Sequence, residues 1–399
     1  MTDPKGGTGR RAGPRRRAEN TVVLNHRSAS HIPGIEPHRH ALQVHRRLPC
    51  YRATPLLDCP DLAAALGVAR VWVKSESSRM GLPSFKMLGA SYAAYRELCH
   101  LLGSEPEWSD LAELRTALAP LGGLTLMAAT DGNHGRAVAR TARTLGYASR
   151  IYVPAGTAAT RITAIESEGA PVALIDGDYD EAVRQCARDA GEGCLVVSDT
   201  SWRGYERIPA WVIDGYATMF WEVHEQLPDA DRLIDAVAVP VGVGALASAA
   251  VRHFRGRARA AGARLIGVEP VGSDCVGQSV RAGHPVIIPG PHTSIMAGLN
   301  CGTPSRLAWP LVERGLDVLV AIDDELAREA MRMLSQAGIV AGETGAAALG
   351  GLLALRDGRQ APQAIKAAGL RPDAQILVIS SEGATDAAAY EQIVGHPPA

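Results

Sequence analysis

The sequence of 399 residues lacks the features that mark several classes of protein. Its formal net charge is only -1, so no strong field favours nucleic acid or a membrane surface as a partner. Its seven cysteines are odd in number and contain no C-x-x-C pair, which argues against a zinc site and against a secreted disulfide framework. Nothing else in the sequence requires a metal.

Long apolar stretches and an export signal are also absent. The longest apolar run, residues 236–251, is too short to span a bilayer and is interrupted by Pro240, Gly242, Gly244 and Ser248. The charged start of the chain is not followed by an apolar run, as it would be in a secretory signal. We therefore expect a cytoplasmic protein with no membrane partner.

Residues 1–20 consist largely of Gly, Arg and Pro and have almost no apolar content. This composition predicts a disordered basic tail. Its arginines could contact nucleic acid, but a solvated tail is the simpler interpretation, and no nucleic-acid partner is expected. We expect the ordered part of the chain to begin near Tyr51.

The rest of the chain has the composition of a globular protein that is large enough for two domains. Patterns typical of strands alternate with helical patterns along two stretches. The strand patterns occupy residues 124–129, 149–153, 172–175 and 194–198, and then residues 236–239, 265–268 and 376–379. The alternation predicts an α/β fold with two open, twisted, mostly parallel sheets, helices on both faces, and a ligand cleft between a large and a small domain.

Residues 77–93 place a single lysine, Lys86, where an apolar run begins. Pro83 and Ser84 are helix-start signals, and the apolar residues that follow Lys86 recur at roughly helical spacing. The positive field at a helix start disfavours an ammonium group, and a lysine with a lowered pKa can form an imine with a carbonyl compound. Taken alone, such a fragment more often holds a solvated surface lysine.

Two glycine-containing loops each join a strand pattern to a helix pattern. The first contains Thr130, Asp131, Gly132, Asn133 and His134, and the second contains Gly242, Val243, Gly244, Ala245 and Leu246. Backbone N–H groups at a helix start suit a carboxylate or a phosphate. The second loop is neither a P-loop nor a complete G-x-G-x-x-G. For both loops, a tight turn with helix capping explains the residues about equally well.

Two further segments place polar side chains at the ends of predicted elements. Ser380 and Ser381 follow an apolar strand pattern at its carboxyl end, where parallel sheets carry functional groups, although helix capping would use the same residues. Glu343 stands among small residues before a helix, where it could serve a ligand or simply favour the helix start.

These segments, in this order, resemble the tryptophan-synthase-β-like family of enzymes, which depend on pyridoxal 5'-phosphate (PLP) and share fold type II. Within this family, the resemblance is greatest to the subfamily of 2,3-diaminopropionate ammonia-lyases. It extends from about residue 51 to about residue 394 and rests on residues 79–82, 84–89, 129–136, 199–205, 294–299 and 379–383. Each motif is weak alone, but the ordered set is specific.

The resemblance implies roles in binding the cofactor. Lys86 would hold PLP as an imine, and Asn133 would hydrogen-bond the hydroxyl group of the ring. The loop 242–246 would bind the phosphate. Ser380, or less favourably Ser381, would lie beside the pyridine nitrogen and leave it largely unprotonated, which suits elimination.

The resemblance also implies how the substrate binds. The loop 130–134 would take the carboxylate of an amino acid, with Glu343 nearby. Related serine and threonine dehydratases carry a small residue in place of Asp131, whose charge suits a second ammonium group. In the subfamily, the aspartate at this place is linked to proton abstraction from the D-isomer, Lys86 would serve the L-isomer, and the aspartate that matches Asp199 is linked to the active site. The implied reaction is α,β-elimination of 2,3-diaminopropionate to pyruvate and two molecules of ammonia.

Two alternatives stay open at this point. The first is a PLP-dependent dehydratase of serine, threonine or another β-substituted amino acid. The second is a protein that binds PLP or an amino acid without catalysis, although the presence of Lys86, Asp131 and Asp199 argues against it.

The resemblance further implies a homodimer and a division of the chain. Residues 21–92 and 227–399 would form the large PLP-binding domain, and residues 93–226 the small domain. Cys275 and Cys301 have the spacing of a disulfide pair known in the subfamily. Because disulfides are unusual in the cytoplasm, we expect two reduced thiols.

Overall fold

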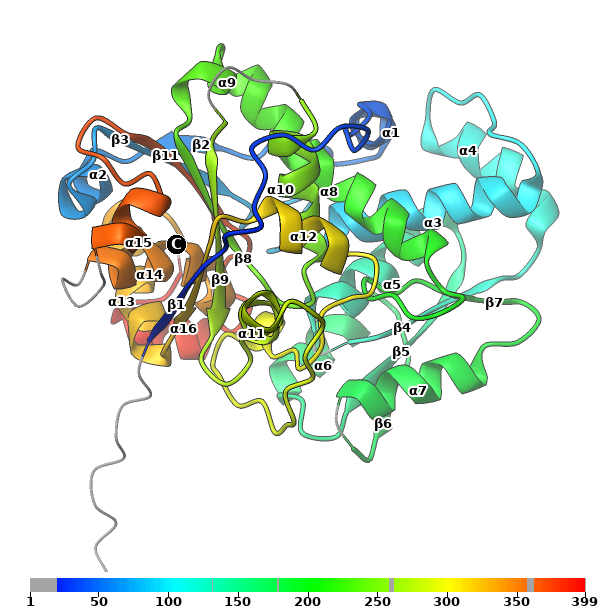
Figure 1. The fold of residues 1–399 in the computed structure, drawn as a ribbon. Helices are drawn as coiled ribbons and strands as arrows, with labels where there is room; N and C mark the ends of the chain where they lie inside the picture. Colours follow the sequence, from blue (N-terminus) through cyan, green and yellow to red (C-terminus); the bar gives the residue numbers. More distant parts are fainter. Residues whose placement is uncertain (1–19, 131, 178, 258–261, 357–361, 399) are drawn as a thin grey trace, which may run out of the picture.

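The computed structural model describes residues 20–398 except 131, 178, 258–261 and 357–361. It has an α/β fold with two separate sheets flanked by helices (Figure 1), which confirms the predicted fold class. The predicted basic tail, apart from Asn20, and Asp131 lie outside the described residues. None of the described helices is both long enough and apolar enough to cross a membrane.

The larger sheet has seven strands in the order β1-β10-β9-β8-β11-β3-β2. Its five inner strands are parallel, and β1 and β2 pair antiparallel at its two edges. Every residue of β8 is buried, as expected for a central strand that is covered on both faces. The strands are β1 (Thr21–Leu24), β2 (Leu56–Asp58), β3 (Arg70–Ser75), β8 (Ala236–Pro240), β9 (Arg264–Pro270), β10 (Val318–Ile322) and β11 (Gln375–Ser380).

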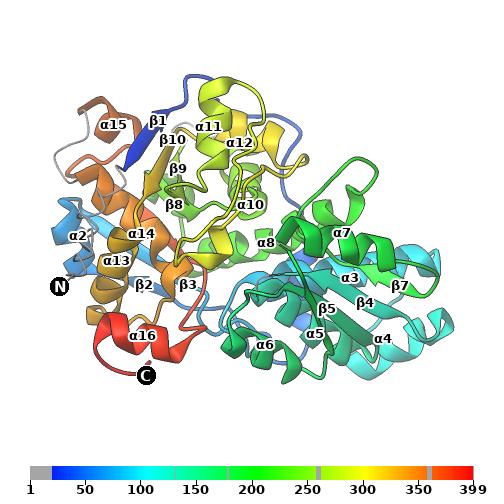
Figure 2. The ribbon, with the colours of Figure 1, turned by 90° about the horizontal axis from the view of Figure 1, so that it is seen from below.

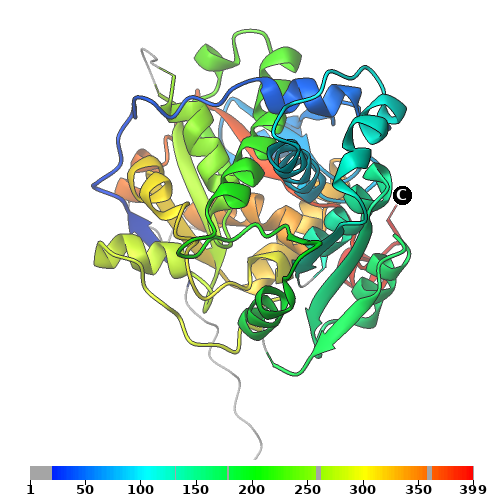
Figure 3. The same ribbon diagram turned by 90° about the vertical axis from the view of Figure 1, so that its right-hand side faces the viewer.

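The smaller sheet has four parallel strands in the order β6-β5-β4-β7. Figures 2 and 3 show it beside the larger sheet, with its own helices around it. Its strands are β4 (Thr125–Ala129), β5 (Ala148–Pro154), β6 (Val172–Ile175) and β7 (Cys194–Val196). All four coincide closely with predicted strand patterns. The assignment of the chain to two domains remains a prediction.

The helices connect the strands and cover both sheets. Up to β7 they are α1 (His40–Arg47), α2 (Pro60–Leu66), α3 (Lys86–Leu102), α4 (Leu111–Leu118), α5 (Asn133–Leu145), α6 (Ala159–Glu166) and α7 (Tyr179–Asp189). After β7 they are α8 (Arg207–Gln226), α9 (Ala230–Leu233), α10 (Ala245–Arg255), α11 (Cys275–Ala282), α12 (Trp309–Gly315), α13 (Asp324–Gln336), α14 (Glu343–Arg356), α15 (Pro362–Ala367) and α16 (Ala387–Val394). Short 3-10 helices occupy Ala119–Leu121 and Ala297–Leu299.

The expectation that order begins near Tyr51 is wrong. Strand β1 and helix α1 both precede that residue. β1 is a four-residue strand whose partner, β10, comes from the other end of the chain, so its stability depends on a contact that no local pattern reveals. α1 is fixed by its buried face, where the ring of His45 bonds the hydroxyl of Thr218 and the carbonyl of Leu88.

Helices α3 and α8 pack closely, and this contact places Lys86. A side chain at Gly215 would collide with the carbonyl oxygen of Leu88, and one at Gly89 would collide with the ring of Tyr216. These two glycines therefore allow the helices to approach one another at the first turns of α3. Helix α8 also packs on α10, which contacts β8 of the larger sheet, and α3 packs on α5, which contacts β4 of the smaller sheet. The lysine helix α3 therefore lies between the elements of the two sheets.

Candidate active site

Lys86 and Asp199 come from different parts of the chain and form an ion pair. Lys86 is the first residue of α3, and Asp199 follows the end of β7. The ammonium Nζ donates a hydrogen bond to Oδ2 of Asp199. Burial alone would raise the pKa of Asp199, but the charges of Lys86 and His134 and the bond from Lys86 together hold that pKa well below its usual range. Asp199 is therefore a carboxylate at neutral pH.

The segment before Lys86 is fixed to the end of β11. The N–H of Phe85 donates to the carbonyl of Ser381 at 3.1 Å, and the N–H of Gly383 donates to the carbonyl of Pro83 at 3.0 Å. These bonds hold the lysine beside the carboxyl end of the strand, where the sequence places Ser380. The hydroxyls of Ser380 and Ser381 are buried and have no hydrogen-bond partner among the described residues. Since buried hydroxyls are normally paired, they are suited to a polar ligand.

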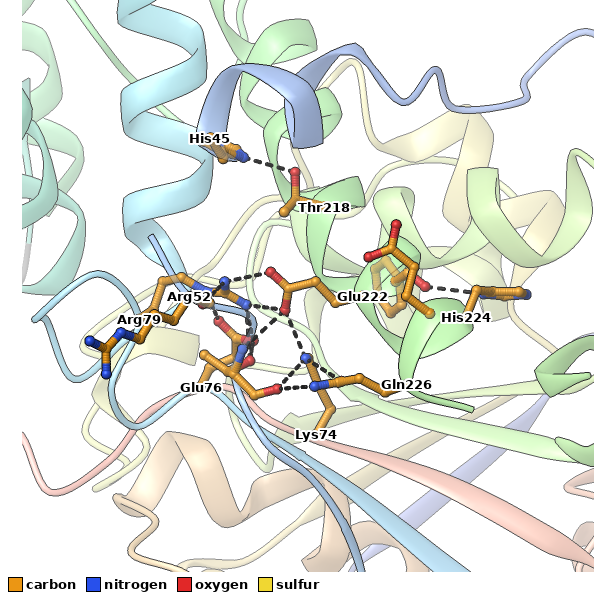
Figure 4. A network of polar contacts seen from close by, with 12 residues as sticks. His45, Arg52, Lys74, Glu76, Arg79, Thr218, Glu222, His224 and Gln226 are labelled. Atoms are coloured by element: carbon orange, nitrogen blue, oxygen red, sulfur yellow. Dashed lines mark hydrogen bonds and ion pairs between the residues drawn. The ribbon is translucent and has the colours of Figure 1, made fainter. Parts of the chain in front are cut away.

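A buried network of charges anchors the same segment to α8 (Figure 4). The guanidinium of Arg79 donates to both carboxylate oxygens of Glu76 and of Glu222 at 2.7–2.8 Å. Lys74 donates to Glu222 at 2.7 Å, and these side chains are completely inaccessible to solvent. The turn that follows Arg79 leads directly to Lys86, so the network fixes the path of the chain into α3.

The described residues of the first loop, Thr130 and 132–134, lie at the start of α5, as predicted. The hydroxyl of Thr130 accepts a hydrogen bond from the N–H of Gly132 at 2.9 Å. His134 donates from Nε2 to the carbonyl of Val197 at 2.8 Å, and its Nδ1 lies 3.9 Å from Asp199. The loop and the Lys86–Asp199 pair therefore belong to one site.

Asn133 directs its side chain at a residue that the sequence analysis did not single out. Its Nδ2 donates to Glu382, whose other carboxylate oxygen accepts from the N–H of Thr344 at 3.3 Å. Glu382 thus joins the start of α5 to the start of α14. It stands in the quoted motif after Ser381, but local pattern alone gave no reason to choose it.

Glu343 is buried at the first turn of α14. Burial raises its pKa, while a bond to its own backbone N–H and the charge of Arg161 act in the other direction. The side chain of Arg161, whose charge acts on Glu343, packs against Gly132 of the loop. The position is compatible both with a role in binding a substrate and with the alternative that Glu343 only favours the helix start.

The loop 242–246 runs from β8 into α10. Gly244 has a φ of +98°, a conformation that favours glycine. A Cβ atom at Gly242 would lie 3.1 Å from the carbonyl oxygen of Gly298 and 3.2 Å from Sγ of Cys301. The backbone N–H groups of the first turn of α10 have no partner within the helix, so the loop has the form of an anion-binding helix start.

Two cysteines lie behind this loop. The thiol of Cys275 is buried and lies 4.0 Å from the carbonyl oxygen of Gly242. Burial is the main cause that raises its pKa, and Cys301 acts in the same direction. The reduced state of Cys275 and Cys301 remains a prediction.

Tyr216 is a second residue that the sequence analysis missed. Its ring is completely buried on α8 and lies 4.6 Å from the ring of Phe85, centroid to centroid. Burial raises the pKa of its hydroxyl, and the charges of Lys86 and Asp199 act on it in opposite directions. The hydroxyl therefore borders the ion pair. No sequence signal marked it, because its position depends on the packing of α8 against α3.

Comparison with known proteins agrees with this arrangement. The family described as "Pyridoxal-phosphate dependent enzyme" matches residues 48–382. The diaminopropionate ammonia-lyase of Escherichia coli K12 is 37% identical over 360 residues, which cover 89% of this chain and 90% of that protein. The crystal structure of the E. coli enzyme in complex with D-serine has a TM-score of 0.85 and 34% identity, and covers 94% of this chain and 97% of that one.

A more distant relative represents the alternative substrate class. The L-threonine ammonia-lyase of Thermotoga maritima is 28% identical over 275 residues, which cover 68% of this chain and 59% of that protein. The chain is thus more similar, and over a greater length, to the diaminopropionate enzymes.

The residues of this site fit PLP. Lys86 offers an amine, the loop 242–246 offers backbone donors for a phosphate, and Ser380 offers a buried hydroxyl without a described partner. The predicted cofactor and the predicted class, a PLP-dependent lyase of fold type II, are confirmed by the similarity over nearly the whole chain. The chain belongs to the pyridoxal-phosphate dependent enzyme family.

Proposed function

We propose that this protein eliminates the β-amino group of 2,3-diaminopropionate and yields pyruvate and two molecules of ammonia. The observation that carries the proposal is the Lys86–Asp199 ion pair beside the buried hydroxyl of Ser380. The choice of substrate is supported by the similarity to the diaminopropionate ammonia-lyases over 89% of the chain.

The proposed cofactor site uses four elements. Lys86 would hold PLP through its amine, the loop 242–246 would bind the phosphate, and Asn133 would serve the ring hydroxyl. Ser380 would face the ring nitrogen. A neutral hydroxyl is too weak an acid to protonate that nitrogen. When bound, PLP supplies an electron-withdrawing ring that stabilises negative charge at the α-carbon of an amino acid.

The proposed proton transfers use this chain's own side chains. Lys86 would remove the α-proton of the L-isomer, and Asp131 that of the D-isomer. Asp199 would hold the amine of Lys86 in place, because its lowered pKa keeps it a carboxylate. For Asp131, which lies outside the described residues, the role rests on the sequence alone.

The proposed substrate contacts combine one anion site and acidic side chains. The N–H groups at the start of α5 would bind the substrate carboxylate. Glu343 and Asp131 would favour a substrate with two ammonium groups over one with a hydroxyl group. We further propose that the protein is a cytoplasmic homodimer and that residues 21–92 with 227–399, and 93–226, form its two domains.

A substrate panel tests the proposal. Purified protein, incubated with PLP, is assayed for 2-oxo acid formation from D- and L-diaminopropionate, serine and threonine; the first three yield pyruvate and threonine yields 2-oxobutyrate. We expect one or both isomers of diaminopropionate to exceed serine in kcat/KM by at least about tenfold, the discrimination that one lost ionic contact gives. Equal or better turnover of serine or threonine would establish the dehydratase alternative, and the absence of any 2-oxo acid from all substrates would favour a binding protein.

A further inference from the structure

The proposed chemistry uses Asp199 but does not explain the structure of the loop that holds it. The loop joins β7 to α8 and contains a tight turn, residues 202–205, closed by two backbone bonds between Trp202 and Tyr205. The rings of these two residues stack with centroids 4.2 Å apart. The stack fixes the ring of Tyr205 against the loop.

The hydroxyl of Tyr205 forms two hydrogen bonds with the backbone just before Asp199, one on either side of Val197. It accepts from the N–H of Ser198 at 3.0 Å and donates to the carbonyl of Val196 at 2.8 Å. The residue between them, Val197, is bound on the other side, since its N–H donates to Met127 at 2.7 Å and its carbonyl accepts from His134. The chain that enters Asp199 is therefore held from two directions.

The chain that leaves Asp199 is also anchored. The hydroxyl of Ser201 lies 2.8 Å from the hydroxyl of Ser305 and accepts from the N–H of Leu307 at 2.8 Å. Ser305 in turn donates from its N–H to the carbonyl of Val243, in the glycine loop. On the side of β7, the Tyr205 hydroxyl is the anchor that binds Ser198, the residue next to Asp199.

We propose that Tyr205 is a positioning residue whose hydroxyl fixes the Asp199 carboxylate against Lys86. The inference deepens the proposed function and rests on it for its catalytic consequence. Burial raises the pKa of the Tyr205 hydroxyl above its usual range, so it remains a neutral donor and acceptor over the whole working pH range. Without it, the N–H of Ser198 and the carbonyl of Val196 would lose their partner, and Ser198 and Asp199 would be held less firmly beyond the bonds of Val197.

The test compares Tyr205→Phe with a matched control, Tyr147→Phe. The hydroxyl of Tyr147 also donates to a backbone carbonyl, that of Leu118 at 3.1 Å, but Tyr147 follows the end of α5 that is remote from His134. Both variants lose one tyrosine hydroxyl and one or two backbone partners. Only Tyr205→Phe changes the loop of Asp199.

The first readout does not depend on turnover. In the protein freed of PLP, Lys86 is methylated with formaldehyde and a borohydride reagent at several pH values, and its labelling is followed by peptide mass spectrometry. We expect Tyr205→Phe to label Lys86 at least about threefold faster at neutral pH, since an ammonium that loses its carboxylate partner loses its proton more readily. The Tyr147→Phe variant should label at the wild-type rate.

The second readout uses the PLP-loaded enzyme. We expect Tyr205→Phe to lower kcat roughly tenfold with KM nearly unchanged, and to shift the acid limb of its pH profile, because a small displacement of a catalytic group costs about this much. Wild-type labelling and a wild-type pH profile in Tyr205→Phe would overturn the inference. If no substrate is turned over, the proposed function fails, but the labelling of Lys86 still decides the role of Tyr205.

A second variant covers the case in which Tyr205→Phe does not fold. Trp202→Leu removes the ring that stacks on Tyr205, so the Tyr205 hydroxyl is held less firmly against the backbone of Ser198 and Val196. We expect faster labelling of Lys86 in this variant too, by a smaller factor than in Tyr205→Phe, and unchanged labelling would overturn the inference.

Discussion

Two clusters of oppositely charged side chains lie close together along the chain, and they differ in their exposure to solvent. In the network of Lys74, Glu76, Arg79 and Glu222, every side chain is inaccessible to solvent, and Arg79 and Lys74 both donate at short distances. In the Lys86–Asp199 pair, 19% of the lysine side chain and 9% of the aspartate side chain remain exposed.

The difference shows how burial separates a structural cluster from a reactive one. The network contains two cations and two anions that satisfy one another, so it has no capacity for a ligand. Lys86 follows a residue whose backbone is bonded to Ser381 at the end of β11, where the buried hydroxyls of Ser380 and Ser381 have no partner among the described residues. A perturbed pKa alone does not identify an active site. Charged groups that are accessible and lie near unsatisfied polar groups identify one better.

Loss of Lys86 should have the largest effect on activity and little effect on folding. We expect Lys86→Ala to lower kcat at least about 10³-fold, because the group that carries the cofactor and moves the proton is lost. Pyruvate assays and absorbance spectra with PLP measure this. Lys366→Ala, on an exposed position of α15, is the control and should behave as wild type. An active Lys86→Ala variant would remove the distinction between the two clusters.

Loss of Arg79 should have the largest effect on stability. Arg79→Met leaves the buried carboxylates of Glu76 and Glu222 with Lys74 as their remaining cation. We expect the free energy of unfolding to fall by about 3–5 kcal/mol, as it does when one partner of a buried ion pair is removed. Arg371→Met removes an exposed arginine that pairs with Asp235 and should cost less than about 1 kcal/mol. Similar losses in the two variants, measured by urea unfolding, would contradict the comparison.

Asp199→Asn should affect both activity and pH dependence. We expect kcat to fall about 100-fold, within the range for a lost acid–base partner. Because the folded-state pKa of Asp199 is lowered, its contribution to stability is present above the unfolded-state pKa of about 4 and is lost as pH falls through the lowered value. The difference in stability between wild type and Asp199→Asn should therefore be greatest near neutral pH and decrease under acid. A difference that grows under acid would show that the ion pair does not form.

Ser380→Ala should have the smallest effect on folding and a measurable effect on the cofactor. Since the Ser380 hydroxyl is buried without a described partner, its removal should leave the free energy of unfolding of the PLP-free protein unchanged or slightly raised. We expect PLP to bind about threefold to tenfold more weakly, as one neutral hydrogen bond is lost. The control, Ser279→Ala, removes a hydroxyl that donates to Cys275 at 2.6 Å and should destabilise the protein by about 1 kcal/mol. Equal destabilisation by both variants would mean that Ser380 has a structural role.

Much of the fold could be predicted from local pattern, because buried parallel strands appear as short apolar runs. β4, β5 and β6 coincide closely with such runs. The run VLVAI of β10 is an equally clear strand signal, although it is not among the predicted strands. β1 could not be predicted in the same way, since only its pairing with β10 makes it a strand. α8 begins at Arg207, two residues before Pro209, because proline is tolerated in the first turn of a helix.

The site could be predicted only in part. The order of motifs identified Lys86, Asp199 and the two loops through their resemblance to a family, and the structure brings Lys86, His134 and Asp199 together. Glu382 and Tyr216 were not singled out because each acts through a contact with a residue distant in the sequence. Tyr205 bonds residues only seven and nine positions away, but no local pattern shows that its ring folds back onto the end of β7. Single-sequence patterns contain no record of such contacts.

The central claim is that Lys86, paired with Asp199, carries the cofactor. The most direct test is to load the protein with PLP, reduce it with borohydride and map the modified peptide by mass spectrometry. The account predicts that the phosphopyridoxyl group is found on Lys86 and on no other lysine. Modification of Lys74 or Lys366 instead, or an unmodified Lys86, would contradict it.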